Sequence, residues 1–269
     1  MVENAKSISE VTSLLQKSIT PLGRREEICL CSAKGRICAE NIHSPLSLPT
    51  SNNAAVDGFA FHYEWSTSNP NNVYDIVAEI RAGHPYSGKL LPGQAVAIFT
   101  GAIVPEELNC IVMQENCILE EKKRVRIPFV PKKGFNIRMA GENLRKGEVI
   151  IKDGQRITAA DIGQLSAIGR SKIFCYSELS IGVLSTGDEV MDTYNTKALS
   201  KLRPGQLYDT NRPMLKAMVT KDNHFCSDYG IIIDDKTSLQ EGYKKALSEN
   251  NIVISTGGAS QGIEDHTQE

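Results

Sequence analysis

The fold of this chain is decided by the stretch Val183-Leu184-Ser185-Thr186-Gly187-Asp188-Glu189. The apolar run 181–184 breaks into a polar turn, which is typical of a buried strand whose carboxyl end opens into a glycine turn. A similar event follows at 252–254, which leads into Ser255-Thr256-Gly257-Gly258-Ala259-Ser260. Ligands of open α/β sheets bind at the carboxyl ends of strands. Ordinary βα loops are the alternative, because Gly and Asp favour turns for conformational reasons alone, but two such turns in one α/β unit favour a shared ligand site.

The residues after Ile173 alternate between strand and helix patterns. Besides the two strands above, the patterns predict a helix at about 212–221 and a strand at about 225–233. A further helix is expected from the capping-box pattern Thr237-Ser238-Leu239-Gln240. This βαβαβ order predicts a parallel sheet with right-handed crossovers.

Carboxylates gather at or just beyond the carboxyl ends of these strands: Asp188, Glu189, Asp234, Asp235 and Asp265. Such a rim suits Mg²⁺, which prefers oxygen ligands and often keeps substrate phosphates in its shell. Unrelated loop residues and helix caps explain the same carboxylates, and the sequence leaves both interpretations open.

The middle of the chain, residues 73–130, predicts short strands punctuated by Gly and Pro, as in a small barrel or sandwich. Its apolar run 95–99 ends in Thr100-Gly101, so an apolar strand ends in Thr-Gly here as it does at 186–187. The polar loop before it passes through Asp57-Gly58, for which a hairpin turn is the simplest explanation. Arg138 lies in a loop-like segment and is either a surface salt bridge or an anion clamp, since a guanidinium matches phosphate geometry.

The first residues predict an amphipathic helix. Ser7-Ile8-Ser9-Glu10 is a capping-box pattern, and Pro21 and Gly23 end the helix. Its apolar residues recur at helical spacing: Ile8, Val11, Leu14, Leu15 and Ile19.

Composition is that of a soluble globular protein of one to three domains, with 269 residues and a net charge of −2. This charge predicts no strong attraction to nucleic acid or membrane. Residues 1–20 contain no apolar core typical of a secretory signal, and no apolar run is long enough to span a bilayer. The seven cysteines are scattered without a Cys-x-x-Cys pair, which favours a reducing compartment and buried thiols.

Seven motifs follow one another along the chain: Asn53–Ala60, Phe99–Pro105, Val112–Glu115, Asn136–Glu142, Leu184–Glu189, Tyr208–Arg212 and Ser255–Ser260. In this order they resemble the molybdopterin molybdenumtransferases, the MoeA and gephyrin E-domain family of molybdenum cofactor synthesis. The motifs cover nearly the whole chain and are together highly specific.

The resemblance implies an α/β plus β fold. It implies an elongated first domain at 1–44 and 131–175, an inserted β-rich, barrel-like domain at 45–130, and a three-layer α/β, molybdopterin-binding domain at 176–269. Adenylated molybdopterin and molybdate are the implied substrates, with hydrolysis of the adenylate, release of AMP and insertion of molybdenum in the presence of Mg²⁺. A cytoplasmic homodimer with a shared active cleft is also implied, acting after a molybdopterin adenylyltransferase.

Residue roles carry over by motif. The resemblance assigns Asp57 and Thr100 to the catalytic surface of the β-rich domain. It assigns catalysis and Mg²⁺ binding in the α/β domain to Glu189, Asp234 and Asp265. Arg138 is expected as a further anion contact. Pterin or phosphate binding is expected from residues of the two turns: Ser185, Thr186, Gly187, Asp188, Gly257, Gly258 and Ser260. The glycines would let the backbone approach the ligand closely.

The sequence departs from the family in two ways. Family members often have Glu-Asp where this chain has Glu142-Asn143, which puts a metal or catalytic role there in doubt. They also continue beyond Glu269, so we expect an incomplete α/β domain with an unfinished sheet edge. The alternative function is a non-catalytic homologue that binds pterin or dimerises. A receptor-anchoring role, as in the gephyrin branch, has no support in this sequence.

Overall fold

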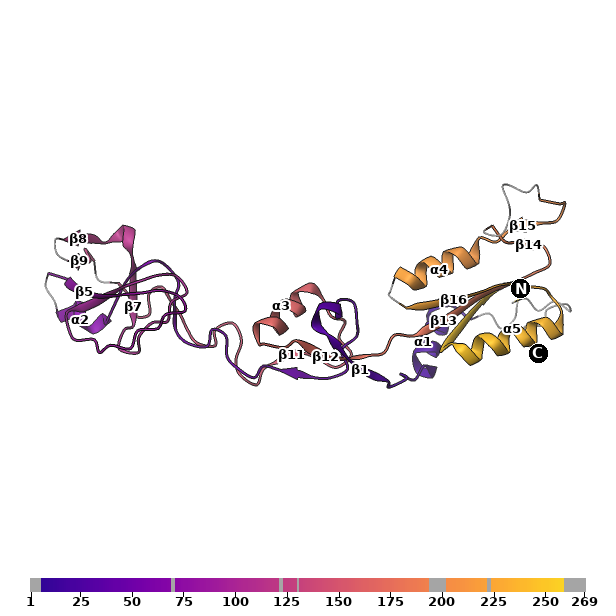
Figure 1. Cartoon of the computed structure of the whole chain (residues 1–269), viewed down its shortest axis with the longest axis horizontal. Coiled ribbons are helices and arrows are strands. Elements are labelled where there is room, and N and C mark those ends of the chain that lie inside the picture. The colour runs from indigo at the N-terminus through magenta and orange to yellow at the C-terminus, as the bar shows by residue number, and fades with distance from the viewer. Residues whose placement is uncertain are drawn as a thin grey trace. The chain divides into compact units, whose positions relative to one another are not determined.

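The chain divides into two compact units. The computed structural model describes residues 6–68, 71–120, 123–129, 131–193, 202–221 and 224–258. Unit 1 comprises Met1–Glu40, Lys152–Ser166 and Arg170–Glu269, and unit 2 comprises Asn41–Ile151 and Ala167–Gly169. Their contents confirm the predicted α/β plus β class (Figure 1). The division into three domains stays a prediction.

A six-stranded sheet forms the centre of unit 2, in the order β7-β4-β6-β5-β9-β8. Only β5 and β6 pair in parallel; the other neighbours are antiparallel. The strands are β4 (Gly58–Phe61), β5 (Val73–Ile80), β6 (Gln94–Ile98), β7 (Cys110–Met113), β8 (Ile118–Glu120) and β9 (Arg124–Arg126).

Both faces of this sheet are buried. Ala60, Val96 and Ile111 belong to one apolar cluster. Their sequence neighbours Phe59, Phe61, Ala95, Cys110 and Val112 belong to the other. Successive side chains of a strand point to opposite faces, so the clusters lie on the two sides of the sheet. This explains why β4 is a continuous buried run rather than an alternating one.

Short elements complete unit 2. Two small antiparallel sheets pair β2 with β11 and β3 with β10. The bounds are β2 (Ile42–His43), β3 (Asn53–Ala54), α2 (Tyr63–Ser68), the 3₁₀ helix η2 (Gln114–Asn116), β10 (Ile137–Arg138) and β11 (Val149–Ile151). Trp65 of α2, the only tryptophan of the chain, packs against both apolar clusters.

A parallel three-stranded sheet, in the order β16-β13-β17, forms the α/β part of unit 1. Its elements are β13 (Ser180–Thr186), α4 (Asn211–Lys221), β16 (Phe225–Ile232), α5 (Lys236–Glu249) and β17 (Ile252–Thr256). Figure 1 shows α4 and α5 on opposite sides of the sheet, as the predicted crossovers require. Ile181 and Val183 of the central strand pack with Val219 of α4.

The remaining elements of unit 1 are short. They are α1 (Ile8–Ser18), β1 (Arg25–Cys29), the 3₁₀ helix η1 (Leu30–Ser32), α3 (Ala159–Ala167), β12 (Lys172–Tyr176), β14 (Val190–Met191) and β15 (Leu207–Tyr208). β1 pairs with β12 antiparallel, and β14 pairs with β15 in parallel. The capping box predicted at Ser7 is present. The one predicted at Thr237 is wrong, because α5 begins at Lys236 and its N-cap is Asp235.

All seven cysteines are free, as predicted, but they are not all buried. Cys29 and Cys31 are exposed, and their sulfur atoms lie 2.7 Å apart. Cys29 is the last residue of β1, and Cys31 lies in η1. Across the described parts of the chain, the helices fall short of the length and apolar character needed to cross a membrane.

The tightest backbone approach in unit 2 generates a prediction for Gly58→Ala. A Cβ atom at Gly58 would lie 2.0 Å from the backbone oxygen of Val112 in the neighbouring strand. We expect the added methyl group to lower the free energy of unfolding of unit 2 by about 1–3 kcal/mol. Urea unfolding followed by the fluorescence of Trp65 measures this loss.

Gly83→Ala is the control for this variant. It adds the same methyl group at an exposed position where nothing lies within 4 Å, although its φ of +81° is unfavourable for alanine. A loss for Gly58→Ala no larger than for Gly83→Ala would contradict the prediction.

Candidate functional site

The two Ser-Thr-Gly turns lie side by side at the carboxyl edge of the parallel sheet. β13 pairs with β17 so that Ser185 is the register partner of Thr256. The hydroxyl oxygens of these two residues are 3.1 Å apart, and Thr186 Oγ1 lies 3.5 Å from the backbone oxygen of Thr256. The structure therefore brings together the two turns that the sequence placed on one edge.

Close approach of the turns explains the glycine at position 257. Its φ is +89°, and a Cβ atom there would lie 2.3 Å from the backbone oxygen of Thr186. Gly187 and Gly258 also have positive φ, at +135° and +60°. A side chain at Gly257 would thus push the two turns apart, and glycine keeps their backbones available to a ligand.

The rim carboxylates have different roles in the structure. Asp188 Oδ1 accepts a hydrogen bond from the backbone nitrogen of Asp234, at 3.2 Å, which ties the turn after β13 to the turn after β16. Glu189 is exposed, and its carboxylate lies close over Gly187. Asp235 caps α5 by accepting a hydrogen bond from the backbone nitrogen of Ser238. Hydrogen bonding with the side chain and then the backbone of Ser238 lowers the pKa of Asp235. Asp265 and Ser260 lie outside the described residues.

The expected Mg²⁺ can be tested against this set of donors. Within the described residues, His, Cys, Asp and Glu side chains nowhere come together in a group of three that could hold a metal ion. Asp188 and Glu189 nevertheless offer only oxygen donors, which Mg²⁺ prefers, and Mg²⁺ is commonly held by one or two carboxylates plus substrate phosphates. The edge therefore fits an ion that arrives with a phosphate-bearing substrate, not one held in advance by a protein cage.

A buried ion cluster beneath the edge was missed by the sequence analysis. The guanidinium of Arg212, with a side chain only 3% exposed, contacts three carboxylates. The distances are 2.9 Å to Asp209, 2.5 Å to Asp228 and 3.1 Å to Asp192. Ser185 donates its hydroxyl hydrogen to Asp209 at 2.8 Å, so the cluster reaches the first Ser-Thr-Gly turn. The motif 208–212 contains Asp209 and Arg212, but nothing local in it indicates burial.

Electrostatics explain why this cluster stays charged. Burial opposes the charge of Arg212, but hydrogen bonds to Asp228 and Asp209 outweigh burial and raise its pKa. Burial likewise opposes ionisation of Asp209, while bonds from Arg212 and Ser185 hold its pKa below the usual range. The pKa of Asp228 is lowered in the same way by Lys216 and Arg212, against the effect of burial.

Asp57 and Thr100 are in direct contact in unit 2. Asp57 immediately precedes β4, and Thr100 follows β6, the strand paired with β4. Thr100 donates both its backbone N–H and its hydroxyl to Asp57 Oδ1, each at 2.7 Å. These bonds lower the pKa of Asp57. The Asp-Gly pair is thus held to a neighbouring turn, and Asp57 Oδ2 is left as the second oxygen of an ionised carboxylate.

Arg138 forms the surface ion pair that was the alternative to an anion clamp. Its Nε donates to Glu142 Oε1 at 2.7 Å, and its Nη2 donates to Asn143 Oδ1 at 3.0 Å. Arg138 lowers the pKa of Glu142. Asn143, where family members often have Asp, therefore acts as a neutral acceptor for Arg138. An anion-binding role for Arg138 stays a prediction.

Together, the fold and the site define a protein with a β-rich unit and an α/β unit; the carboxyl edge of its parallel sheet, where the two glycine turns meet, is the candidate ligand edge. Comparison with known families gives two matches. Residues 6–169 match the family described as "MoeA N-terminal region (domain I and II)", and residues 182–269 match the "Probable molybdopterin binding domain". This chain belongs to the MoeA family, as its motifs predicted.

Individual relatives agree with this assignment. A molybdopterin molybdenumtransferase from Haemophilus influenzae is 34% identical over 90% of this chain and 58% of its own length. One from Nostoc is 32% identical over 98% of this chain and 60% of its own length. The crystal structure of a molybdopterin biosynthesis MoeA protein from Pyrococcus horikoshii superimposes with a TM-score of 0.84 at 28% identity, over 93% of this chain and 65% of that one. The chain thus spans about three-fifths of the length of the curated relatives it matches.

The contact between the two turns predicts the effect of Gly257→Ala. We expect the clash with the backbone of Thr186 to lower the stability of the α/β sheet by about 1–3 kcal/mol beyond the cost of the unfavourable φ. Hydrogen exchange of peptides from β13 and β17 measures this loss. Gly205→Ala is the matched control, because Gly205 has the same φ of +89° with nothing within 4 Å. Equal losses of stability in Gly257→Ala and Gly205→Ala would show that the close contact between Gly257 and the backbone of Thr186 is not required.

The ion cluster predicts that the stability loss caused by Arg212→Met depends on pH and is largest at neutral pH. Asp209 and Asp228 have lowered pKa values, so their contribution to stability is complete above about pH 4 and is lost as the pH falls through those values. Removing Arg212 leaves Asp209 buried without its cation, at a cost of about 3–5 kcal/mol at neutral pH. We therefore expect the stability difference between the parent and Arg212→Met to narrow as the pH falls below 4, because protonation relieves the unpaired carboxylate.

Hydrogen exchange of β13 at pH 7 and pH 3.5 tests this effect on the free energy of opening. Arg203→Met removes an arginine charge from an exposed position of the same unit and is expected to change stability little at either pH. A difference between the parent and Arg212→Met that stays constant with pH would contradict the assignment of the cluster.

Proposed function

We propose that this chain acts in molybdenum cofactor synthesis, inserting molybdenum from molybdate into adenylated molybdopterin with hydrolysis of the adenylate and release of AMP. The observation that carries the proposal is the pairing of two Ser-Thr-Gly turns at one carboxyl edge, in a chain of the MoeA family. Curated relatives carry the name molybdopterin molybdenumtransferase. Because the chain spans only 58% of the first of them, its own turnover is part of the proposal.

The ligand edge would bind the pterin and its phosphates. The backbone around Gly187 and Gly257 would approach an anionic ligand closely beside the hydroxyl of Thr186, while the hydroxyl of Ser185, which donates to Asp209, would hold the first turn in place. Asp188 and Glu189, with Asp234 and Asp265 as further candidates, would hold Mg²⁺ together with the substrate phosphates. The ion would offset the negative charge that develops on the phosphoanhydride.

Asp57 is the proposed catalytic carboxylate of unit 2. Thr100 fixes its Oδ1 and keeps its pKa low, so the group is ionised at neutral pH. Its Oδ2 would orient the water that attacks the phosphoanhydride, which is general-base chemistry. The active cleft is proposed to be shared between two protomers.

AMP release tests the proposal directly. The purified chain is incubated with adenylated molybdopterin, Mg²⁺ and molybdate, and pterin binding is measured in parallel. AMP that appears only with molybdate supports molybdenum insertion by this chain. Pterin binding without AMP release supports the alternative, a non-catalytic pterin-binding homologue. If the chain neither binds pterin nor releases AMP, both molybdenum insertion and the pterin-binding alternative are contradicted.

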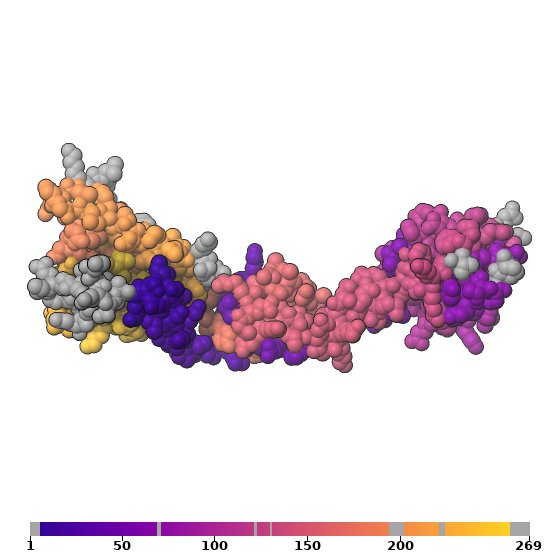
Figure 2. Space-filling model, turned by 180° about the vertical axis from the view of Figure 1, so that it is seen from behind, coloured from indigo at the N-terminus to yellow at the C-terminus, as the bar shows by residue number. Residues whose placement is uncertain are grey.

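A homodimer is the second part of the proposal, and α1 supports it. Figure 2 shows α1, in indigo, at the surface of unit 1. None of its residues is buried, and its apolar stripe is exposed: Ile8 87%, Val11 42%, Leu14 46%, Leu15 53% and Ile19 68%. A partner protomer would cover this stripe. The homodimer would act in the cytoplasm and receive its substrate from a molybdopterin adenylyltransferase.

For Asp57→Ala we expect loss of AMP release by about a hundredfold or more, since a positioned general base commonly contributes at least that factor. Folding is expected to stay near normal because Asp57 lies outside the apolar clusters of unit 2. Asp75→Ala, which removes an exposed carboxylate of the same unit, is the control and should keep the parent rate. AMP release by Asp57→Ala at the parent rate would refute the assignment of Asp57.

For Leu15→Asp we expect loss of self-association, because a charge would be placed in the middle of the apolar stripe. Sedimentation velocity measures the distribution of monomer and dimer. Gln16→Asp adds a negative charge at the next, polar position of α1 and should leave association unchanged. If Leu15→Asp sediments as the parent does, α1 is not the dimer contact.

A further inference from the structure

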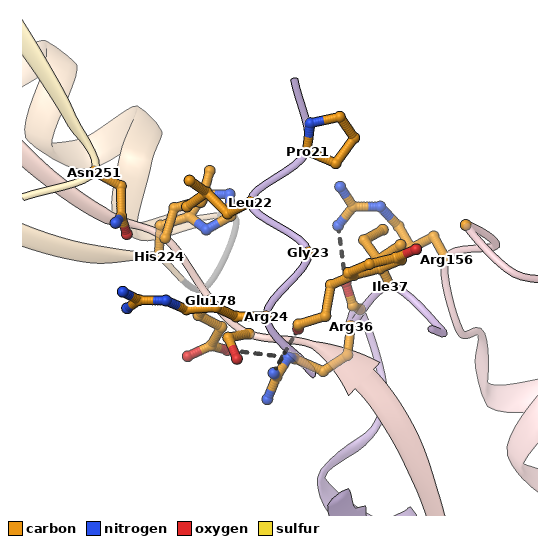
Figure 3. A pocket seen from close by; sticks show the side chains of 15 residues that line it. Pro21, Leu22, Gly23, Arg24, Arg36, Ile37, Arg156, Glu178, His224 and Asn251 are labelled. Atoms are coloured by element: carbon orange, nitrogen blue, oxygen red, sulfur yellow. Dashed lines mark hydrogen bonds and ion pairs between the residues drawn. The ribbon is translucent and has the colours of Figure 1, made fainter. Parts of the chain in front are cut away.

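Unit 1 contains a cavity of about 530 Å³ at the edge of the α/β sheet opposite to the Ser-Thr-Gly turns. On the sheet side it is lined by Leu179, His224 and Asn251, which immediately precede β13, β16 and β17. The rest of the wall is formed by the segments 21–24, 35–37 and 176–178 together with Gly154 and Arg156 (Figure 3). None of the residues predicted for pterin, metal or catalysis lines this cavity.

The wall carries an excess of positive charge. Three arginines line it, against one carboxylate, Glu178. Arg36 is already engaged: it contacts Glu26, donates to the backbone oxygen of Tyr176 at 2.9 Å and lies 3.6 Å from Glu178. The excess charge therefore comes from Arg24 and Arg156.

Donors in the wall lack acceptors. Among the described residues, no carboxylate lies within ion-pair distance of Arg24 or Arg156, and Arg156 donates only to the backbone oxygen of Gly35, at 3.0 Å. His224 Nδ1 is buried without a hydrogen-bond partner in the same set. The side-chain oxygen of Asn251 accepts from Ser180 N and Oγ, both at 3.0 Å, so its amide N–H groups are left for another acceptor. A buried polar atom without a partner, such as His224 Nδ1, is unfavourable, whereas Arg24, Arg156 and Asn251 are exposed and available to a ligand from solvent; an anionic ligand would accept hydrogen bonds from these donors.

Apolar side chains line the same cavity. Leu22, Ile37 and Leu179 contribute aliphatic surface beside the charged groups. The volume lies within the range of about 300–1,000 Å³ that is typical of small-molecule sites, which combine apolar walls with a few polar groups. A bare inorganic ion would leave this apolar surface unused.

We infer that this cavity binds a small organic anion, a phosphate or carboxylate group carried on an apolar ring, with Arg24 and Arg156 as the anion contacts. The inference goes beyond the proposed function, because the site lies at the other end of the strands from the proposed pterin edge. Such a ligand would link the segment 21–24 to the starts of all three parallel strands. Bound ligand is therefore expected to stabilise unit 1.

Isothermal titration of the full chain with phenyl phosphate tests the site, with inorganic phosphate and benzoate as comparisons. We expect one molecule of phenyl phosphate per chain, bound at least tenfold more tightly than inorganic phosphate. Arg24→Ala and Arg156→Ala should each weaken this binding at least tenfold. Leu22→Ser should weaken the binding of phenyl phosphate but leave that of inorganic phosphate unchanged. Benzoate, which carries a carboxylate on the same ring, should also bind, and Arg24→Ala should weaken its binding.

Arg170→Ala is the matched control, since it removes an exposed arginine of the same unit that does not line the cavity. It should bind phenyl phosphate as the parent does, and circular dichroism checks that every variant is folded. The inference is overturned if phenyl phosphate does not bind, or if Arg24→Ala and Arg156→Ala bind it as tightly as Arg170→Ala. It is also overturned if inorganic phosphate binds as tightly as phenyl phosphate. None of these outcomes depends on AMP release, so this experiment tests the cavity independently of the proposed function.

Discussion

The buried guanidinium of Arg212 is the interaction on which the ligand edge of unit 1 depends. It joins Asp209, which precedes α4, to Asp228 of β16 and to Asp192, which follows β14. A buried charge without its partners is strongly unfavourable, so these segments have to be ordered together. Through Asp209 the cluster also holds the hydroxyl of Ser185, and so it fixes the turn that opens the edge.

The same kind of hydrogen bond, from a hydroxyl to a carboxylate, occurs in both units. In each, a hydroxyl at a strand end donates to a carboxylate from another segment: Ser185 to Asp209 in unit 1, and Thr100 to Asp57 in unit 2. Asp209 is 4% exposed and its oxygens are taken up by Arg212 and Ser185, so it positions the turn. Asp57 is only half-buried, and both hydrogen bonds from Thr100 go to its Oδ1, which leaves Oδ2 available. Exposure and the number of partners thus distinguish Asp209, whose oxygens are engaged within the structure, from Asp57, the proposed catalytic carboxylate.

Local patterns predicted the parts of the structure that local physics determines. The strand before Ser185, the helix capped by Ser7 and the second glycine turn were all predicted because apolar period, caps and turn residues act over a few positions. The Arg212 cluster was missed because it joins residues far apart in sequence. Asp235 illustrates the limit at a single position: a carboxylate after a strand is equally a rim ligand or a cap, and only the start of α5 distinguishes them.

Helix α1 has a consequence for how the chain acquires its full secondary structure. It is 11 residues long with none of them buried, so tertiary packing contributes little to it, and helices shorter than about 12–15 residues are marginal in water on their own. Its capping box offsets only part of the cost of nucleation. The helical content of this segment is therefore coupled to whatever surface covers its apolar stripe, and docking there is at the same time a folding reaction with a negative heat-capacity change.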